Sequence, residues 1–69
     1  MKIEFNKVDA RNYDVLVNDD DYGKLTFDDE QNAWVLWPNS IDDGVTYFES
    51  LKETEEAITD EIKDYSENN

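Results

Sequence analysis

The chain has 69 residues, with 6 Lys and Arg, 19 Asp and Glu and no His, so its formal net charge is −13. It also has no Cys, which excludes disulfides, thiol nucleophiles and the usual His and Cys ligands of zinc sites. A chain this short forms at most one small domain, and so small a domain seldom encloses a catalytic cleft. We therefore expect a protein that is not an enzyme and that uses no metal or cofactor.

The apolar residues are few but regularly spaced. A mean hydropathy of −0.92 and a high net charge are typical of disordered chains. Two Trp, four Tyr and three Phe, spaced at periods of two and then 3.6 residues, favour a folded domain instead. The longest apolar run, residues 33–37, is far shorter than the roughly 20 residues of a membrane span. Residues 1–7 lack the apolar block of a secretory signal, so we expect a cytoplasmic protein.

The first half of the chain alternates between apolar and polar residues, which is the period of a β-strand. The alternation predicts four strands, at residues 2–8, 12–18, 23–28 and 33–37. Short separators rich in Asp, Asn and Gly connect them, which indicates an antiparallel meander. Pro38 lacks the amide N–H that a strand ladder needs, so it ends the fourth strand. Residues 41–48 are expected to form a longer loop or an irregular strand.

The last third of the chain changes to the period of a helix. Ser50 and Glu53 have the spacing of a capping box, in which Ser50 caps the Glu53 amide and Glu53 reaches back to Ser50. A helix is predicted over residues 51–65, followed by a frayed tail at residues 66–69. Its apolar stripe comprises Leu51, Ile58, Ile62 and Tyr65, with Thr54 and Ala57 on one flank.

These elements predict an α+β domain, a four-stranded antiparallel β-meander with one C-terminal α-helix packed on one face. The other face of the sheet then remains open. Trp34 and Trp37 have opposite parity within one strand, so at least one of them is expected on the open face unless the strand is bulged. Leu16 is out of phase with Val15 and Val17 and is a candidate for the same face.

The helix carries a ribbon of carboxylates opposite its apolar stripe: Glu53, Glu56, Asp60, Asp64 and Glu67. At 1.5 Å per residue the ribbon is about 21 Å long, with neighbouring carboxylates about 4.5–6 Å apart, a scale comparable with the phosphates of a nucleic-acid strand. Further acidic clusters lie in three separators: Asp19, Asp20 and Asp21; Asp28, Asp29 and Glu30; Asp42 and Asp43. Surfaces that are merely soluble usually mix both signs of charge. The near-single sign favours a basic partner, although an ordinary solvated face is the alternative for the helix.

Apolar anchors would have to supply most of the affinity, because exposed ion pairs contribute only about 0–1 kcal/mol each. Interface energy concentrates in Trp, Tyr and Arg. Trp34, Trp37 and Tyr22, the last placed in a turn, are the candidate anchors. Core packing is the alternative for each of them.

In size, acidity and sheet-plus-helix layout, the chain resembles small phage-encoded antagonists of host defence, the anti-CRISPR and anti-restriction proteins. The resemblance implies a basic DNA-binding partner, such as a CRISPR effector, a restriction enzyme or a nuclease. The negative charge of the chain would repel nucleic-acid backbones and anionic lipid headgroups, so we expect no direct contact with nucleic acid or membrane. The predicted function is an acidic inhibitor that acts by nucleic-acid mimicry. Two alternatives remain open: an immunity protein or antitoxin that blocks a basic toxin, and a small adaptor that binds through its open sheet face. The oligomeric state is open as well.

Overall fold

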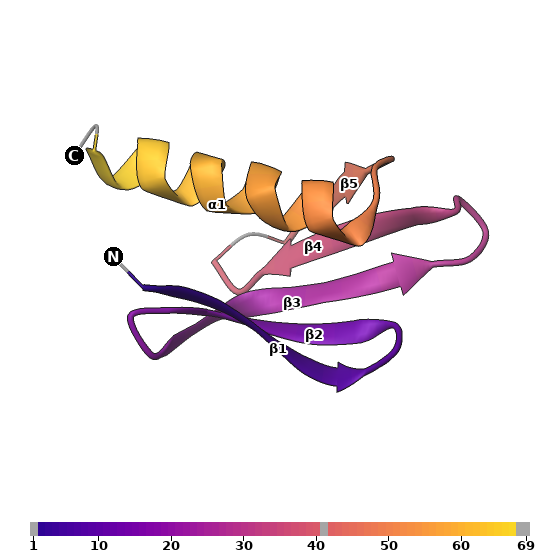
Figure 1. Cartoon of the computed structure of the whole chain (residues 1–69), viewed down its shortest axis with the longest axis horizontal. Coiled ribbons are helices and arrows are strands. Elements are labelled where there is room, and N and C mark those ends of the chain that lie inside the picture. Colours follow the sequence, from indigo (N-terminus) through magenta and orange to yellow (C-terminus); the bar gives the residue numbers. More distant parts are fainter. Residues whose placement is uncertain (1, 41, 68–69) are drawn as a thin grey trace.

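The computed structural model describes residues 2–40 and 42–67, with side chains as far as Asp64. The elements in this part of the chain are β1 (Ile3–Asp9), β2 (Asn12–Val17), β3 (Asp20–Asp28), β4 (Ala33–Pro38), β5 (Val45–Tyr47) and α1 (Leu51–Glu67). Each strand pairs antiparallel with the next, so the sheet order is β1-β2-β3-β4-β5. Figure 1 shows α1 lying along one face of this sheet. The predicted α+β class, with an antiparallel sheet and one C-terminal helix, is confirmed.

The prediction of four strands was wrong, because β5 adds a fifth. β5 pairs with β4 through the register Trp34↔Tyr47, Val35↔Thr46 and Leu36↔Val45. Three residues are too few to display an alternating period, so the sequence alone leaves this segment between a loop and an irregular strand. The segment becomes a strand because β4 supplies its hydrogen-bonding partners. Residue 41, within the same predicted segment, lies outside the described residues.

β3 begins at Asp20, three residues before its predicted start. The turn that precedes it has only Asn18 and Asp19 as central residues, with φ angles of 54° and 70°. Two left-handed residues in succession are the geometry of a tight two-residue hairpin turn. A β-bulge follows, since Val15 pairs with Gly23 whereas its neighbour Leu16 pairs with Asp21. The acidic run 19–21 is therefore shared between a turn and the start of a strand.

Replacing Asp19 with glycine is expected to stabilise the protein by about 0.5–1 kcal/mol, because a left-handed φ costs a residue with a Cβ more than it costs glycine. Urea denaturation followed by tryptophan fluorescence measures the change. Asp19→Asn is the matched control, since it removes the same charge and the exposed ion pair with Lys2 but keeps a side chain. An equal gain in the two variants would show that charge relief, rather than backbone geometry, is responsible.

α1 begins at its predicted residue and is capped by Ser50. The Glu53 N–H donates to the Ser50 Oγ at 3.2 Å, and the Ser50 hydroxyl donates to the Glu53 Oε1 at 3.2 Å. The Thr54 N–H donates to the Ser50 carbonyl at 2.9 Å, which is the first bond of the helical ladder. The helix continues to Glu67, so the predicted tail is still helical at residues 66 and 67. Residues 68–69 lie outside the described part of the chain.

The core lies between α1 and the sheet face that the helix covers. Its buried members are Val15, Leu25, Trp34, Leu36, Tyr47, Ile58 and Ile62. Trp34 makes edge-to-face contacts with Tyr13 and Phe27, with ring centroids 5.8 and 5.1 Å apart. Leu51 and Ala57 are half-buried against the same cluster. The predicted apolar stripe is thus confirmed as far as Ile62, and the side chain of Tyr65 lies outside the described ones.

Replacing Thr54 with valine is expected to raise the free energy of unfolding by about 1–2 kcal/mol. Thr54 is fully buried, and its Oγ1 has no hydrogen-bond partner among the described residues. A buried hydroxyl without a partner costs about 1–3 kcal/mol, which an isosteric methyl group avoids. Urea denaturation measures the gain, with the half-buried Thr59→Val as the control that should change little. A loss of stability in Thr54→Val would mean that this hydroxyl has a partner after all.

Candidate partner-binding surfaces

The outer face of α1 carries most of the predicted acidic ribbon. The exposed carboxylates along it are Glu53, Glu56, Asp60 and Asp64. From the first to the last of them the helix rises about 16 Å, at 1.5 Å per residue. Lys52 and Lys63 are exposed on the same helix, and the side chain of Glu67 lies outside the described ones. The side of α1 that faces away from the sheet is therefore predominantly negative.

The acidic clusters of the loops lie at two opposite ends of the sheet. In a meander, alternate connections lie at the same end, and Figure 1 shows the β2–β3 turn and the β4–β5 connection together at one end. The clusters at residues 19–21 and 42–43 share that end, where the Asn39 N–H donates to the Tyr22 carbonyl at 2.9 Å. The cluster at residues 28–30 lies in the β3–β4 turn, at the other end. Two of the three predicted clusters thus lie toward one end of the sheet, and the third lies at the other end.

Carboxylates in the β3–β4 turn also stabilise the turn itself. Asp28 accepts hydrogen bonds from the Gln31 side-chain amide at 2.7 Å and from the Glu30 N–H at 3.0 Å. These hydrogen bonds hold the pKa of the Asp28 carboxyl below its ordinary range. Asp29 forms an exposed ion pair with Arg11 of the neighbouring turn. Asp28 and Asp29 are therefore engaged within the protein, and Glu30 is exposed to solvent.

The three predicted aromatic anchors have different surroundings. Trp34 is only 8% exposed and serves the core, so it offers a partner almost no surface. Tyr22 lies within β3 rather than in a turn, at the bulge, and is half-buried against the core. Trp37 is 46% exposed and points to the open face. One Trp thus lies on each side of the sheet, as the parity of the two positions predicts.

Trp37 borders a shallow depression on the open face. Thr26 and Val35, which pair across β3 and β4, line it together with residues 28–30 of the β3–β4 turn. Gly44 packs closely behind Trp37: a Cβ there would lie 2.8 Å from the Val35 Cγ1 and 3.0 Å from the indole Cζ3. The absence of a side chain at Gly44 leaves room for the indole ring beside it. The alternating period predicts that Val35 and Trp37 share a face, but no sequence pattern indicates that Gly44 covers them.

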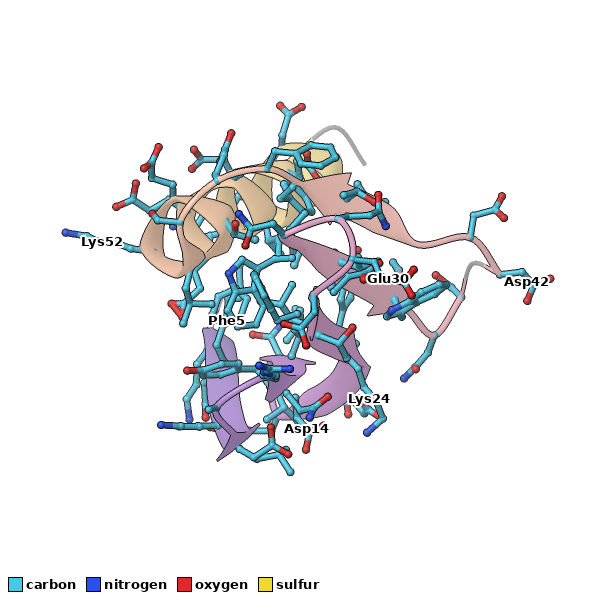
Figure 2. The ribbon with its side chains drawn as sticks, turned by 90° about the vertical axis from the view of Figure 1, so that its right-hand side faces the viewer. Phe5, Asp14, Lys24, Glu30, Asp42 and Lys52 are labelled. Carbon is cyan, nitrogen blue, oxygen red and sulfur yellow. The ribbon has the colours of Figure 1, made fainter. Side chains whose placement is uncertain are left out.

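Leu16, the other apolar residue predicted on the open face, is half-buried. It lies two residues from Asp14 in β2, so the two side chains lie on the same face of the sheet. Asp14 forms an ion pair with Lys24 at 3.2 Å, and Lys24 is paired in register with Trp37. Figure 2 shows Asp14 and Lys24 close together and Lys52 of α1 on the other side of the domain. The open face is thus mixed in charge near β2 and acidic near the β3–β4 turn.

A second depression lies between β1 and α1. Ile3 and Phe5 of β1 line it, together with helix residues that include Glu55, Glu56 and Asp60. Figure 2 shows Phe5 between β1 and the helix. Burial raises the pKa of the Glu55 carboxyl above its ordinary value. This depression is continuous with the acidic ribbon, because Glu56 and Asp60 belong to both.

Tyr47 makes a polar contact that sequence reasoning missed: its hydroxyl donates to the Glu61 Oε2 at 2.8 Å. Burial, and next the hydrogen bond to Glu61, raise the pKa of Tyr47 above its ordinary value of 10.0. The folded state therefore holds this proton more tightly than the unfolded state.

We expect the free energy of unfolding to fall as the pH rises above about 10, and to fall less steeply in Tyr47→Phe. Urea denaturation at several pH values between about 9 and 11.5 measures both slopes, and equal slopes would contradict the assignment.

In the described part of the chain, no group of three or more acidic side chains is placed so that it could hold a metal ion. None of its helices is long and apolar enough to cross a membrane. No protein-family model matches the sequence, and no curated protein or solved structure matches it.

Proposed function

We propose that this protein is an acidic inhibitor that binds the basic nucleic-acid-binding surface of a DNA- or RNA-processing protein. The observation that carries the proposal is the exposed strip of carboxylates on the outer face of α1. With 19 acidic residues against 6 basic ones, internal ion pairs cannot neutralise the surface. Such a surface repels nucleic acid and anionic lipid, and it attracts a basic groove.

The rigidity of α1 supports mimicry in particular. A helix holds its carboxylates at fixed spacings along about 16 Å, so they can follow a row of Lys and Arg side chains that would otherwise contact phosphates. Complementary potentials accelerate association and disfavour wrong partners. Binding would also relieve the repulsion that a net charge of −13 imposes on so small a domain. The proposal includes the class named by the resemblance, phage-encoded anti-CRISPR or anti-restriction inhibitors acting in the host-cell cytoplasm.

The first test is capture of partners from a host-cell lysate with the tagged full chain, washed at low and then at high salt, and identified by mass spectrometry. The proposal expects a basic nucleic-acid-binding protein that salt releases and that duplex DNA or RNA displaces. Salt sensitivity is expected because screening weakens contacts between exposed charges. A partner that stays bound at high salt and ignores nucleic acid would overturn mimicry and favour the antitoxin or adaptor alternatives.

The second test localises the contact with two charge-reversal variants of equal charge. Glu56→Lys with Asp60→Lys changes the outer face of α1, and Asp42→Lys with Asp43→Lys changes the β4–β5 connection; all four residues are exposed. The proposal expects the helix variant to lose binding to the captured partner and the loop variant to lose much less. Equal losses would show that net charge, rather than the helix, determines binding.

A further inference from the structure

We infer that the depression beside Trp37 on the open sheet face is a docking site for an arginine side chain on a basic, extended segment of the partner. This inference rests on the proposed function and adds a second contact surface to it. The site lies on the opposite side of the sheet from α1, so it can be tested independently of the acidic ribbon. The indole of Trp37 is exposed, it lies beside Gly44 and Val35, and acidic residues line the depression next to it.

Trp37 has the properties of an interface anchor. Trp37 is 46% exposed, while Val35 in the lining of the depression is buried, and the indole lies beside Gly44. A tryptophan side chain has only two rotatable bonds, so it loses little conformational entropy when a partner binds. Exposed tryptophans in such settings contribute a large share of interface energy.

The charges around the depression specify a cationic occupant. Asp28, Asp29 and Glu30 form the rim at the β3–β4 turn, and the hydrogen bonds to Asp28 keep that carboxyl ionised. Arg11 compensates one of these three charges through its ion pair with Asp29. The rim therefore keeps a net negative charge. A second copy of this chain is a poor occupant, because its net charge is also −13.

Arginine fits this arrangement better than lysine does. Its planar guanidinium can stack on the indole face and still donate hydrogen bonds to carboxylates, whereas the lysine ammonium is a compact and strongly hydrated charge. The aliphatic part of the side chain can lie over Thr26 and Val35, which form the floor of the depression. The neighbouring Lys24 is engaged with Asp14, so it does not fill the site.

The test is a titration of the full chain with capped hexa-arginine and hexalysine peptides at low salt, followed by NMR of the two indole Nε1–H groups. The inference expects the Trp37 resonance to shift and that of buried Trp34 to stay nearly unchanged. Hexa-arginine should bind about two- to fivefold more tightly than hexalysine, because a guanidinium can stack on the indole and donate hydrogen bonds to the carboxylates at the same time. An unmoved Trp37 resonance, or equal affinities for the two peptides, would overturn the inference.

A matched pair of variants shows whether the arginine peptide binds at the depression or anywhere on the acidic surface. Glu30→Gln removes one charge from the rim, and Glu49→Gln removes the same charge from the exposed segment that precedes α1. The inference expects hexa-arginine to bind about twofold more weakly to Glu30→Gln and almost unchanged to Glu49→Gln. Equal effects would show that the peptide samples the whole acidic surface, and would overturn the site.

Binding of the captured partner to variants of each surface distinguishes this inference from the proposed function. If reversal of Glu56 and Asp60 abolishes binding while Trp37→Ala and Glu30→Gln leave it intact, the proposed function stands and the docking site is wrong. If Glu30→Gln and Trp37→Ala weaken binding and the helix variant does not, the docking site stands and mimicry by the helix is wrong. Glu30 is exposed, so its variant keeps the test valid even if Trp37→Ala fails to fold.

Discussion

Replacing Ile58 with alanine is expected to lower the free energy of unfolding by about 2–5 kcal/mol, the usual cost of a cavity in a core. Ile58 is 0% exposed and lies where α1 contacts the sheet. A domain of this length has a total stability of only about 3–10 kcal/mol. Ile58→Ala should therefore remove a large share of the total stability of the domain.

Urea denaturation, followed by the fluorescence of buried Trp34, measures this loss. Phe48→Ala is a suitable control, because Phe48 is 71% exposed and its removal should change stability by less than about 0.5 kcal/mol. A loss below 1 kcal/mol in Ile58→Ala would mean that α1 contributes little to the core, and would contradict the two-layer packing of the domain.

Replacing Gly23 with alanine is expected to cost about 1–3 kcal/mol or more, because the new methyl group would collide with backbone. A Cβ at Gly23 would lie 2.4 Å from the Trp37 carbonyl oxygen and 2.8 Å from the Pro38 Cα. These atoms belong to the paired strand β4, so they can move only if the end of the β3–β4 ladder opens. Trp37 and the depression beside it would move with that end of the strand.

Gly44→Ala is the informative control for this prediction. There the new Cβ would meet side-chain atoms of Val35 and Trp37, and the exposed indole can turn away. Gly44→Ala should lose less stability than Gly23→Ala in urea denaturation, yet change the NMR signal of the Trp37 indole. Equal losses would show that the indole is as firmly held as the backbone of β4.

The division of the surface into two faces has a consequence for any partner. The carboxylates on α1 and the exposed indole of Trp37 lie on opposite sides of the sheet, because Trp37 alternates with the buried residues of β4 that face the helix. Figure 1 shows the helix on one side of the sheet only. A flat partner surface can contact one face or the other. A partner that contacts both must surround the domain, as a groove or channel for nucleic acid could.

Much of the fold was predictable from the sequence, because it follows from local rules. The period of two residues reflects side chains that alternate across a sheet, and the period of 3.6 reflects one face of a helix. The capping box at Ser50 is likewise a contact within four residues, so its spacing is visible in the sequence. The acidic ribbon on α1 follows from the same helical geometry, and four of its members are exposed as expected.

Only the tertiary structure decided the features that depend on strand pairing. β5 exists because β4 lies beside it, and the bulge at Tyr22 follows from the register between β2 and β3. Parity required the two tryptophans to face opposite ways, but contact with α1 determined that Trp34 is the buried one. The hydrogen bond from the Asn39 N–H to the Tyr22 carbonyl, and the packing of Gly44 against Trp37, join residues of different elements. Such contacts leave no periodic signal, because their energies depend on neighbours that only the folded chain supplies.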